Sequence, residues 1–238
     1  MVQCGEWPDS SGRKITEFRS RKSGALFMMR RVLIAAVVMV LLGAAITAVF
    51  CIRQARRDAA RSRTFGRLCQ LRLSLEIYED LHGTLPPRLL QDRHGNPTHS
   101  WLALVLSQLE QKAIFDKLDV SKGWDTATNA DAIKLGRPFW EWFSQDGYFP
   151  CALKSEESIW NPVTGSPRGL LKQFPDSIVL IAVPLDGVHP LQPCGIDNED
   201  LRQALEDGQE VLFINCDGIY GTVGIEDGNI TYLPSVSR

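Results

Sequence analysis

Four histidines are the first candidates for metal or acid–base chemistry in this chain: His82, His94, His99 and His189. His94 and His99 stand five positions apart in a loop-like segment, whereas two histidines that bind one metal from a helix stand four positions apart. His82 is expected at a helix end, where the helix dipole favours a cationic side chain. We therefore predict polar turn and capping roles for these residues, and no metal site.

The six cysteines are candidates for disulfide chemistry. Cys4 is near the start of the chain, and Cys51 ends an apolar run. In an oxidising compartment the other four could form two disulfides, with three pairings open: Cys69, Cys151, Cys194 and Cys216. Because no Cys-x-x-Cys pair occurs, neither a zinc ribbon nor a redox motif is indicated.

Neighbouring carboxylates are the remaining candidates for catalysis. Glu156-Glu157 and Glu199-Asp200 stand in loop-like sequence, where we expect water to solvate them. Asp217-Gly218 and Asp227-Gly228 are predicted turns with too few clustered oxygens for calcium. No nucleophile elbow, phosphate-binding loop or His-Glu-x-x-His motif occurs. We expect no catalytic, cofactor-binding or metal-binding residue, and no enzyme.

Charge and aromatic content narrow the choice of partners. The net charge is −2, and basic residues concentrate only beside the apolar run, so we predict no nucleic-acid binding. Five tryptophans lie beyond that run and predict core packing or, alternatively, a surface for a partner or glycan: Trp101, Trp124, Trp140, Trp142 and Trp160.

The apolar run, Val32 to Ile52, has no charged side chain and a single polar one, Thr47. A helix needs about 20 such residues to cross a bilayer. Arg31 and Arg53 flank the run, and arginine favours the headgroup level. We predict a transmembrane helix with its boundaries at Val32 and Ile52, and hence the lipid bilayer as a partner.

Three other interpretations of the run agree less well with its residues. A buried core helix is rarely apolar on every face over this length. A cleaved signal peptide has a shorter apolar region and a shorter basic region before it. A lipoprotein signal needs a small residue before its cysteine, but Phe50 precedes Cys51.

The run divides the chain into four segments. Residues 1–31 have no apolar period and are predicted to be a disordered basic tail before the span at 32–52. Residues 53–82 contain no proline and are predicted to continue the helix. Their apolar stripe is Phe65, Leu68, Leu71, Leu75 and Tyr78. Gly83 suits a helix C-cap and Pro86-Pro87 prevents continuation, so residues 83–238 form the globular domain.

Within that domain, apolar spacing predicts a helix from Ser100, its N-cap, to about residue 118. Residues 123–175 are expected to form loops, with short elements around 139–143. Strands are predicted at 177–183, 211–216, 219–225 and 229–233, with Asp-Gly hairpin turns between the last three. The predicted fold class is α+β: one membrane-crossing helix that continues onto an antiparallel sheet, the general plan of type IV pilins and pseudopilins.

Particular motifs then resemble a bacterial family of unknown function that is abundant in planctomycetes. That family has a pilin-like N-terminus and a C-terminal H-x9-DG signature. Its helix-ending turn matches His82-Gly83 with Pro86-Pro87. Further motifs match in order over most of residues 60 to 233: His99-Ser100-Trp101, Leu109-Glu110-Gln111, Trp124-Asp125, Asn129 and Phe149-x-Cys151, followed by the segments Ile178 to Val183 and Val188 to Pro193.

The chain departs from the family pattern in two places. Family members carry a cleavage glycine followed by a stretch with a glutamate, but Gly24 is followed by Ala25 to Arg31 without one. The signature histidine is an aspartate, either Asp207 before Asp217-Gly218 or Asp217 before Asp227-Gly228.

The resemblance implies a pseudopilin-like structural or interaction protein of the cell envelope. It implies a single-pass protein of the inner membrane with a cytoplasmic N-terminus and an extracytoplasmic domain. Other pilin-like or secretion-system proteins are the implied partners. The missing glutamate favours an alternative, an anchored binding module that does not polymerise.

Overall fold

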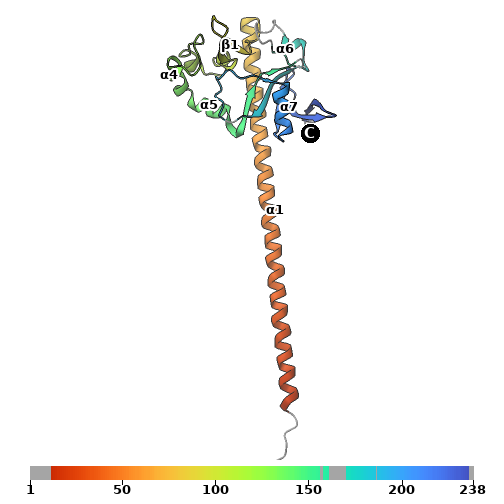
Figure 1. Cartoon of the computed structure of the whole chain (residues 1–238). Helices are drawn as coiled ribbons and strands as arrows, with labels where there is room; N and C mark the ends of the chain where they lie inside the picture. Colours follow the sequence, from red (N-terminus) through yellow and green to blue (C-terminus); the bar gives the residue numbers. More distant parts are fainter. Residues whose placement is uncertain (1–11, 156–157, 161–169, 186, 236–238) are drawn as a thin grey trace, which may run out of the picture. The chain divides into compact units, whose positions relative to one another are not determined.

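The computed structural model describes residues 12–155, 158–160, 170–185 and 187–235, with the backbone alone for 12–27 and 170. The chain divides into two compact units, Met1–Asp58 and Ala59–Arg238. One helix, α1 (Gly12–His82), contributes to both. The fold class is α+β, as predicted: a long N-terminal apolar helix and an antiparallel sheet (Figure 1).

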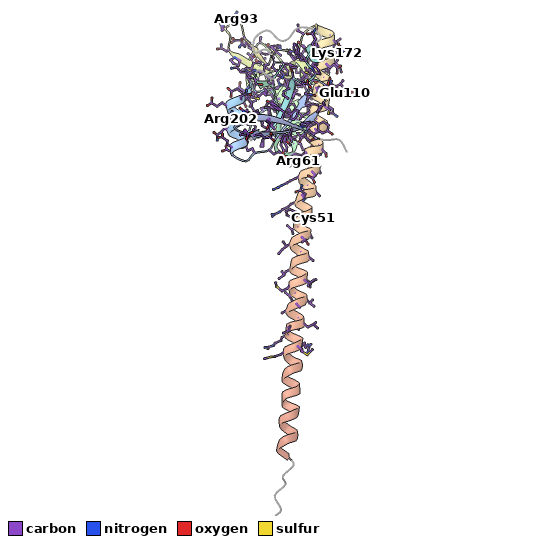
Figure 2. The ribbon with its side chains drawn as sticks, turned by 90° about the vertical axis from the view of Figure 1, so that its right-hand side faces the viewer. Cys51, Arg61, Arg93, Glu110, Lys172 and Arg202 are labelled. Carbon is purple, nitrogen blue, oxygen red and sulfur yellow. The ribbon has the colours of Figure 1, made fainter. Side chains whose placement is uncertain are left out.

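The first unit is helix throughout its described residues. Every side chain from Met28 to Asp58 is exposed, and Figure 2 shows Cys51 among side chains that project from the helix without a neighbour. The Thr47 hydroxyl donates to the carbonyls of Gly43 and Ala44, at 3.1 and 2.9 Å, so the helix itself satisfies the one polar group of the run. By length and composition, α1 is the one described helix able to cross a membrane.

Helix α1 begins earlier than the sequence suggests. Its first residue, Gly12, lies inside the segment 1–31 for which we predict a disordered tail. No proline occurs between Pro8 and Pro86, and Arg, Lys and Glu propagate a helix well once the apolar run has nucleated it. Residues 1–11 lie outside the described residues.

The end of α1 confirms the predicted cap. Gly83 has φ +80°, and its N–H donates to the carbonyl of Glu79 at 2.8 Å, which satisfies a terminal carbonyl of the helix. The chain then bends through Pro86-Pro87 into an antiparallel hairpin of β1 (Leu89–Gln91) and β2 (Pro97–Ser100).

The single helix predicted from Ser100 to about residue 118 is wrong. The segment holds two short helices, α2 (Leu102–Val105) and α3 (Lys112–Phe115). Glu110 between them has φ +60°, which no α-helix accommodates. Ser100 is no N-cap either, because it ends β2 and its hydroxyl donates to the Pro190 carbonyl at 2.6 Å.

The middle of the chain is more regular than predicted. Helix α5 (Arg137–Phe143) confirms the short element expected near residue 139. The structure adds η1 (Ala127–Asn129), α4 (Ala130–Leu135), η2 (Gln145–Gly147), β3 (Tyr148–Cys151), β4 (Leu153–Lys154) and α6 (Leu170–Gln173). These added elements are two to six residues long, too short for apolar periodicity to reveal.

The main sheet has the order β3-β5-β7-β8-β9, and all its neighbours are antiparallel. Four of its strands confirm the sequence predictions: β5 (Ile178–Pro184), β7 (Val211–Asn215), β8 (Tyr220–Glu226) and β9 (Asn229–Pro234). Both Asp-Gly turns are confirmed, because Gly218 has φ +84° and Asp227-Gly228 has φ +50° and +78°.

One helix of the domain is not predicted from the sequence. Helix α7 (Asn198–Glu206) follows β6 (Ile196–Asp197), which pairs in parallel with β4. Asp197 and Asp200 form a capping box at its start, so Glu199-Asp200 lie in a first helical turn and not in a loop. The other carboxylate pair, Glu156-Glu157, lies outside the described residues.

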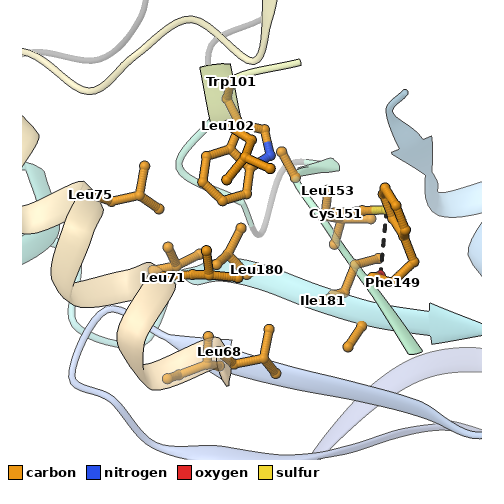
Figure 3. Packing of buried hydrophobic residues seen from close by; sticks show 14 of the residues in the cluster. Leu68, Leu71, Leu75, Trp101, Leu102, Phe149, Cys151, Leu153, Leu180 and Ile181 are labelled. Atoms are coloured by element: carbon orange, nitrogen blue, oxygen red, sulfur yellow. Dashed lines mark hydrogen bonds between the residues drawn. The ribbon is translucent and has the colours of Figure 1, made fainter. Parts of the chain in front are cut away.

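The core joins α1 to the sheet. Leu68, Leu71 and Leu75 of α1 are fully buried, and Figure 3 shows Leu71 beside Leu180 of β5. Trp101, Trp140 and Trp160 are also buried, which confirms core packing for these three tryptophans. Trp124 and Trp142 are only partly buried and pack against the edge of the core.

Candidate functional site

Three segments far apart in the sequence meet at residues 189–191. The β2 residue Ser100 bonds this segment twice, from its N–H to the Leu191 carbonyl at 3.0 Å and from its hydroxyl to Pro190. The Trp124 ring stacks on His189, with centroids 4.8 Å apart and planes 13° apart. The Trp124 N–H donates in turn to the carbonyl of Thr98. Two of the motifs matched from the sequence therefore hold a third segment in place.

His189 is enclosed by aromatic rings. Trp140 of α5 also meets the His189 ring edge to face, with a centroid distance of 5.2 Å. Its Nδ1 accepts the Leu191 N–H at 3.2 Å, and its buried Nε2 has no hydrogen-bond partner within the described residues. Burial lowers the pKa of His189 to about 4. The ring is therefore neutral near pH 7, and too weak a base for acid–base catalysis there.

A groove of about 930 Å³ opens beside this ring, between α4, α5 and the segment 187–190. We call it the α4–α5 groove; Figure 1 shows the two helices that form one side of it. Its charged lining residues carry both signs: Asp125, Lys134, Arg137 and Glu141. Trp140 and His189 add aromatic surface. Mixed charge and aromatic surface suit a polar ligand or a peptide segment.

A second cluster forms around two cysteines. Cys151 of β3 and Cys194 share a hydrogen bond with sulfurs 3.8 Å apart, and the Arg88 side chain is buried beside Gly195. All five described cysteines are free thiols: Cys51, Cys69, Cys151, Cys194 and Cys216. Among the described residues, no three His, Cys, Asp or Glu side chains gather closely enough to hold a metal ion.

The other matched motif residues serve turns and packing. His82 stacks on Tyr78 at the end of α1, with ring centroids 4.1 Å apart. Trp101 packs against Trp160 in the core, and Gln111 precedes α3. His99 is fully buried with neither ring nitrogen bonded among the described residues, and burial lowers its pKa. Neither Asp-Gly turn belongs to the groove.

The sequence did not indicate the groove. His189 has no metal-ligand spacing to another histidine, and no sequence motif marks Arg88. Two features of the sequence pointed toward this region: the density of tryptophans between residues 101 and 160, and the resemblance of the segment Val188 to Pro193 to the family. The partner of Trp124 lies 65 positions further along the chain, and only folding brings the two rings together.

Comparison with known proteins gives one match. A family model described as "Protein of unknown function (DUF1559)" matches residues 53–139. This is the family of unknown function that the motifs resemble, and the match runs from the α1 extension into α5. The N-terminal and C-terminal features expected from the resemblance lie outside the matched residues. No curated protein and no solved structure matches the chain.

Proposed function

We propose that this chain is a membrane-anchored, pseudopilin-like structural or interaction protein of a bacterial cell envelope. It works through its surfaces and carries out no catalysis. Residues 32–52 cross the inner membrane, with the N-terminus in the cytoplasm and the α+β domain outside. Its partners are the bilayer and other pilin-like or secretion-system proteins, including further copies of itself.

The observation that carries the proposal is a second apolar face on α1 within the domain. Leu73, Ile77 and Leu81 follow one another at spacings of four and are 53%, 39% and 69% exposed. Cys69 extends the row by one step and is also exposed. We call these four residues the outer α1 stripe. A helix that packs only on its own sheet needs a single apolar face, so a second face favours contact with another helix.

Cross-linking of the full-length protein in membranes tests this role. With the native cysteines replaced by serine, Ile77→Cys should give bismaleimide-linked dimers and larger species. The matched control is Glu206→Cys, an exposed position at the end of α7 that should stay monomeric. Equal cross-linking at both positions would remove the support that the outer α1 stripe gives.

The state of the N-terminus tests the filament version. Edman sequencing of the purified protein gives its first residue, and electron microscopy of sheared surface fractions detects filaments. An intact segment 1–31 on a monomer would exclude a filament subunit. Protection of the domain from protease added to spheroplasts would contradict the proposed orientation.

The α4–α5 groove favours a second function, an anchored module that binds an envelope component without polymerising. Its aromatic and mixed-charge lining suits a ligand. The chain also lacks the prepilin glutamate that the family pattern carries, which favours a protein that does not assemble into filaments. Arg137→Ala together with Glu141→Ala should weaken binding of peptidoglycan fragments or envelope peptides in a pull-down. Unchanged retention would argue against the groove as the binding surface.

A further inference from the structure

Cys151 and Cys194 differ in access although their sulfurs are neighbours. Cys151 ends β3, is 1% exposed, and also contacts the Phe149 carbonyl, which the dashed line in Figure 3 marks. Cys194 precedes β6 and is partly exposed. The two sulfurs are 3.8 Å apart, and a disulfide of about 2.05 Å requires side-chain movements of roughly 2 Å. A reagent in solution therefore reaches Cys194 first, with Cys151 directly behind it.

A buried cation lies beside the accessible thiol. A Cβ atom on Gly195 would come within 1.4 Å of Arg88 Nη1, so glycine at this position makes room for the guanidinium. Arg88 is 8% exposed, and its Nε has no hydrogen-bond partner within the described residues. The charge of Arg88 interacts with Cys194 and, to a smaller extent, with Asp197, so the guanidinium can stabilise a thiolate on Cys194.

The electrostatics distinguish the two sulfurs. The hydrogen bond with Cys151 lowers the pKa of the Cys194 thiol, burial opposes that change, and Arg88 lowers the pKa further. Burial raises the pKa of Cys151. Outside the pair, burial raises the pKa of Cys216 to about 12 and that of Cys69 to a smaller extent. Cys194 is the thiol of the domain that is best suited to attack.

We propose that Cys151 and Cys194 form a redox modification site, at which a small disulfide or a thiol–disulfide oxidoreductase converts the two thiols into one disulfide. The Cys194 thiolate attacks one sulfur of the oxidant R–S–S–R′, and R′–S⁻ leaves and takes up a proton. Cys151 loses its proton to water, and its sulfur attacks the Cys194 sulfur of the mixed disulfide, which releases R–S⁻. Two electrons pass to the oxidant, which ends as two thiols.

The bond joins two parts of the domain that are 43 positions apart. It ties the sheet strand β3 to the segment that continues back to His189 in the α4–α5 groove. Oxidation should therefore stiffen one wall of the groove, and should raise the melting temperature by roughly 5–10 °C. The reaction does not depend on the proposed membrane orientation, because the test supplies the oxidant.

Peptide mapping of the full-length protein in detergent tests the pairing. Oxidised and reduced glutathione set the redox conditions, iodoacetamide blocks free thiols, and trypsin places the four domain cysteines in four separate peptides. A link between peptides 135–154 and 173–202 is expected, also in Cys69→Ser/Cys216→Ser. Complete alkylation of both peptides after oxidation, or a link of either one to Cys69 or Cys216, would overturn the proposal.

The role of Arg88 as a positioning residue has its own readout. Arg88→Met should slow alkylation of Cys194 at pH 7 by about tenfold and shift its pH–rate profile to higher pH, while Arg88→Lys should restore part of the rate. Arg93→Met, at an exposed arginine of the β1–β2 turn, is the matched control (Figure 2). Equal rates in Arg88→Met and wild type, with both folded by circular dichroism, would contradict the assignment.

Discussion

Arg63 and Asp146 form a two-point ion pair between α1 and the turn that follows α5. Arg63 Nε lies 2.9 Å from Asp146 Oδ2, and Nη2 lies 2.6 Å from Oδ1. Asp146 has φ +68°, a conformation that aspartate and asparagine tolerate better than most residues. Arg67 approaches the same carboxylate at 3.6 Å and donates to the Trp142 carbonyl at 2.8 Å. The turn before β3 is thereby held against the helix.

Removing this carboxylate should destabilise the domain in a pH-dependent way. Hydrogen bonding from Arg63 lowers the pKa of Asp146, so the stabilisation is complete above the unfolded value of about 3.9 and is lost as the pH falls through the lower folded value. Asp146→Asn keeps the shape and tolerates positive φ. At pH 7 the loss of the ion pair should lower the melting temperature. The decrease should be only a few degrees, because solvent screens the exposed Arg63 side chain.

Thermal unfolding of the detergent-solubilised protein, followed by tryptophan fluorescence, measures this effect. The difference between wild type and Asp146→Asn should stay constant from pH 7 to 5 and shrink below pH 4. Asp80→Asn, at an exposed carboxylate on α1, should change little. A difference that grows on acidification would show that the pair is not what holds the turn.

Truncation of two leucines that are two positions apart on α1 should change the stability of the domain by very different amounts. Leu71 is fully buried against the sheet, so Leu71→Ala leaves a cavity and should cost about 2–5 kcal/mol. Leu73 is 53% exposed, and Leu73→Ala should stay within about 0.5 kcal/mol of wild type. Urea unfolding of the solubilised protein measures both. Similar losses in the two variants would mean that the face assignment of α1 is wrong.

Two glycines of β8 form a second matched pair. A Cβ atom on Gly221 would lie 2.0 Å from the Leu233 carbonyl oxygen of β9, a backbone atom that cannot move without breaking the hairpin. Gly221→Ala should therefore cost about 1–3 kcal/mol. A Cβ atom on Gly224 would meet the side chains of Leu233 and Thr231 at 3.6 and 3.8 Å, which is ordinary van der Waals contact, so Gly224→Ala should be neutral or slightly stabilising. The melting temperatures of the two variants, compared with that of wild type, test this difference. An unchanged melting temperature for Gly221→Ala would contradict the β8–β9 register.

His189 should make the domain less stable in mild acid. Its folded pKa is about 4, whereas histidine in an unfolded chain titrates near ~6.5. Between these values only the unfolded chain binds the proton, so stability falls as the pH is lowered through this window. His189→Asn leaves an acceptor near the Leu191 N–H and does not titrate there. Its melting temperature should fall less than that of wild type between pH 7 and 5; parallel curves would exclude burial of His189.

Local patterns in the sequence determined the largest elements. The uncharged run 32–52, the stripe from Phe65 to Tyr78 and the cap at Gly83 each depend on neighbours within one or two helical turns. The strands from residue 177 onward were recognisable as short runs rich in branched apolar residues. Asp-Gly turns, whose glycines accept positive φ, separate the last three of these runs. The class α+β followed from the order of these elements.

Only the tertiary structure decided where the short elements lie and what they bring together. A positive φ at Glu110 divides the segment that looked like one helix, and the capping box at Asp197 starts a helix in sequence that looked like a loop. The Trp124–His189 stack, the Cys151–Cys194 contact and the Arg63–Asp146 pair join residues 43 to 83 positions apart. Such contacts form when burial of the core positions their backbones, and no local pattern encodes them.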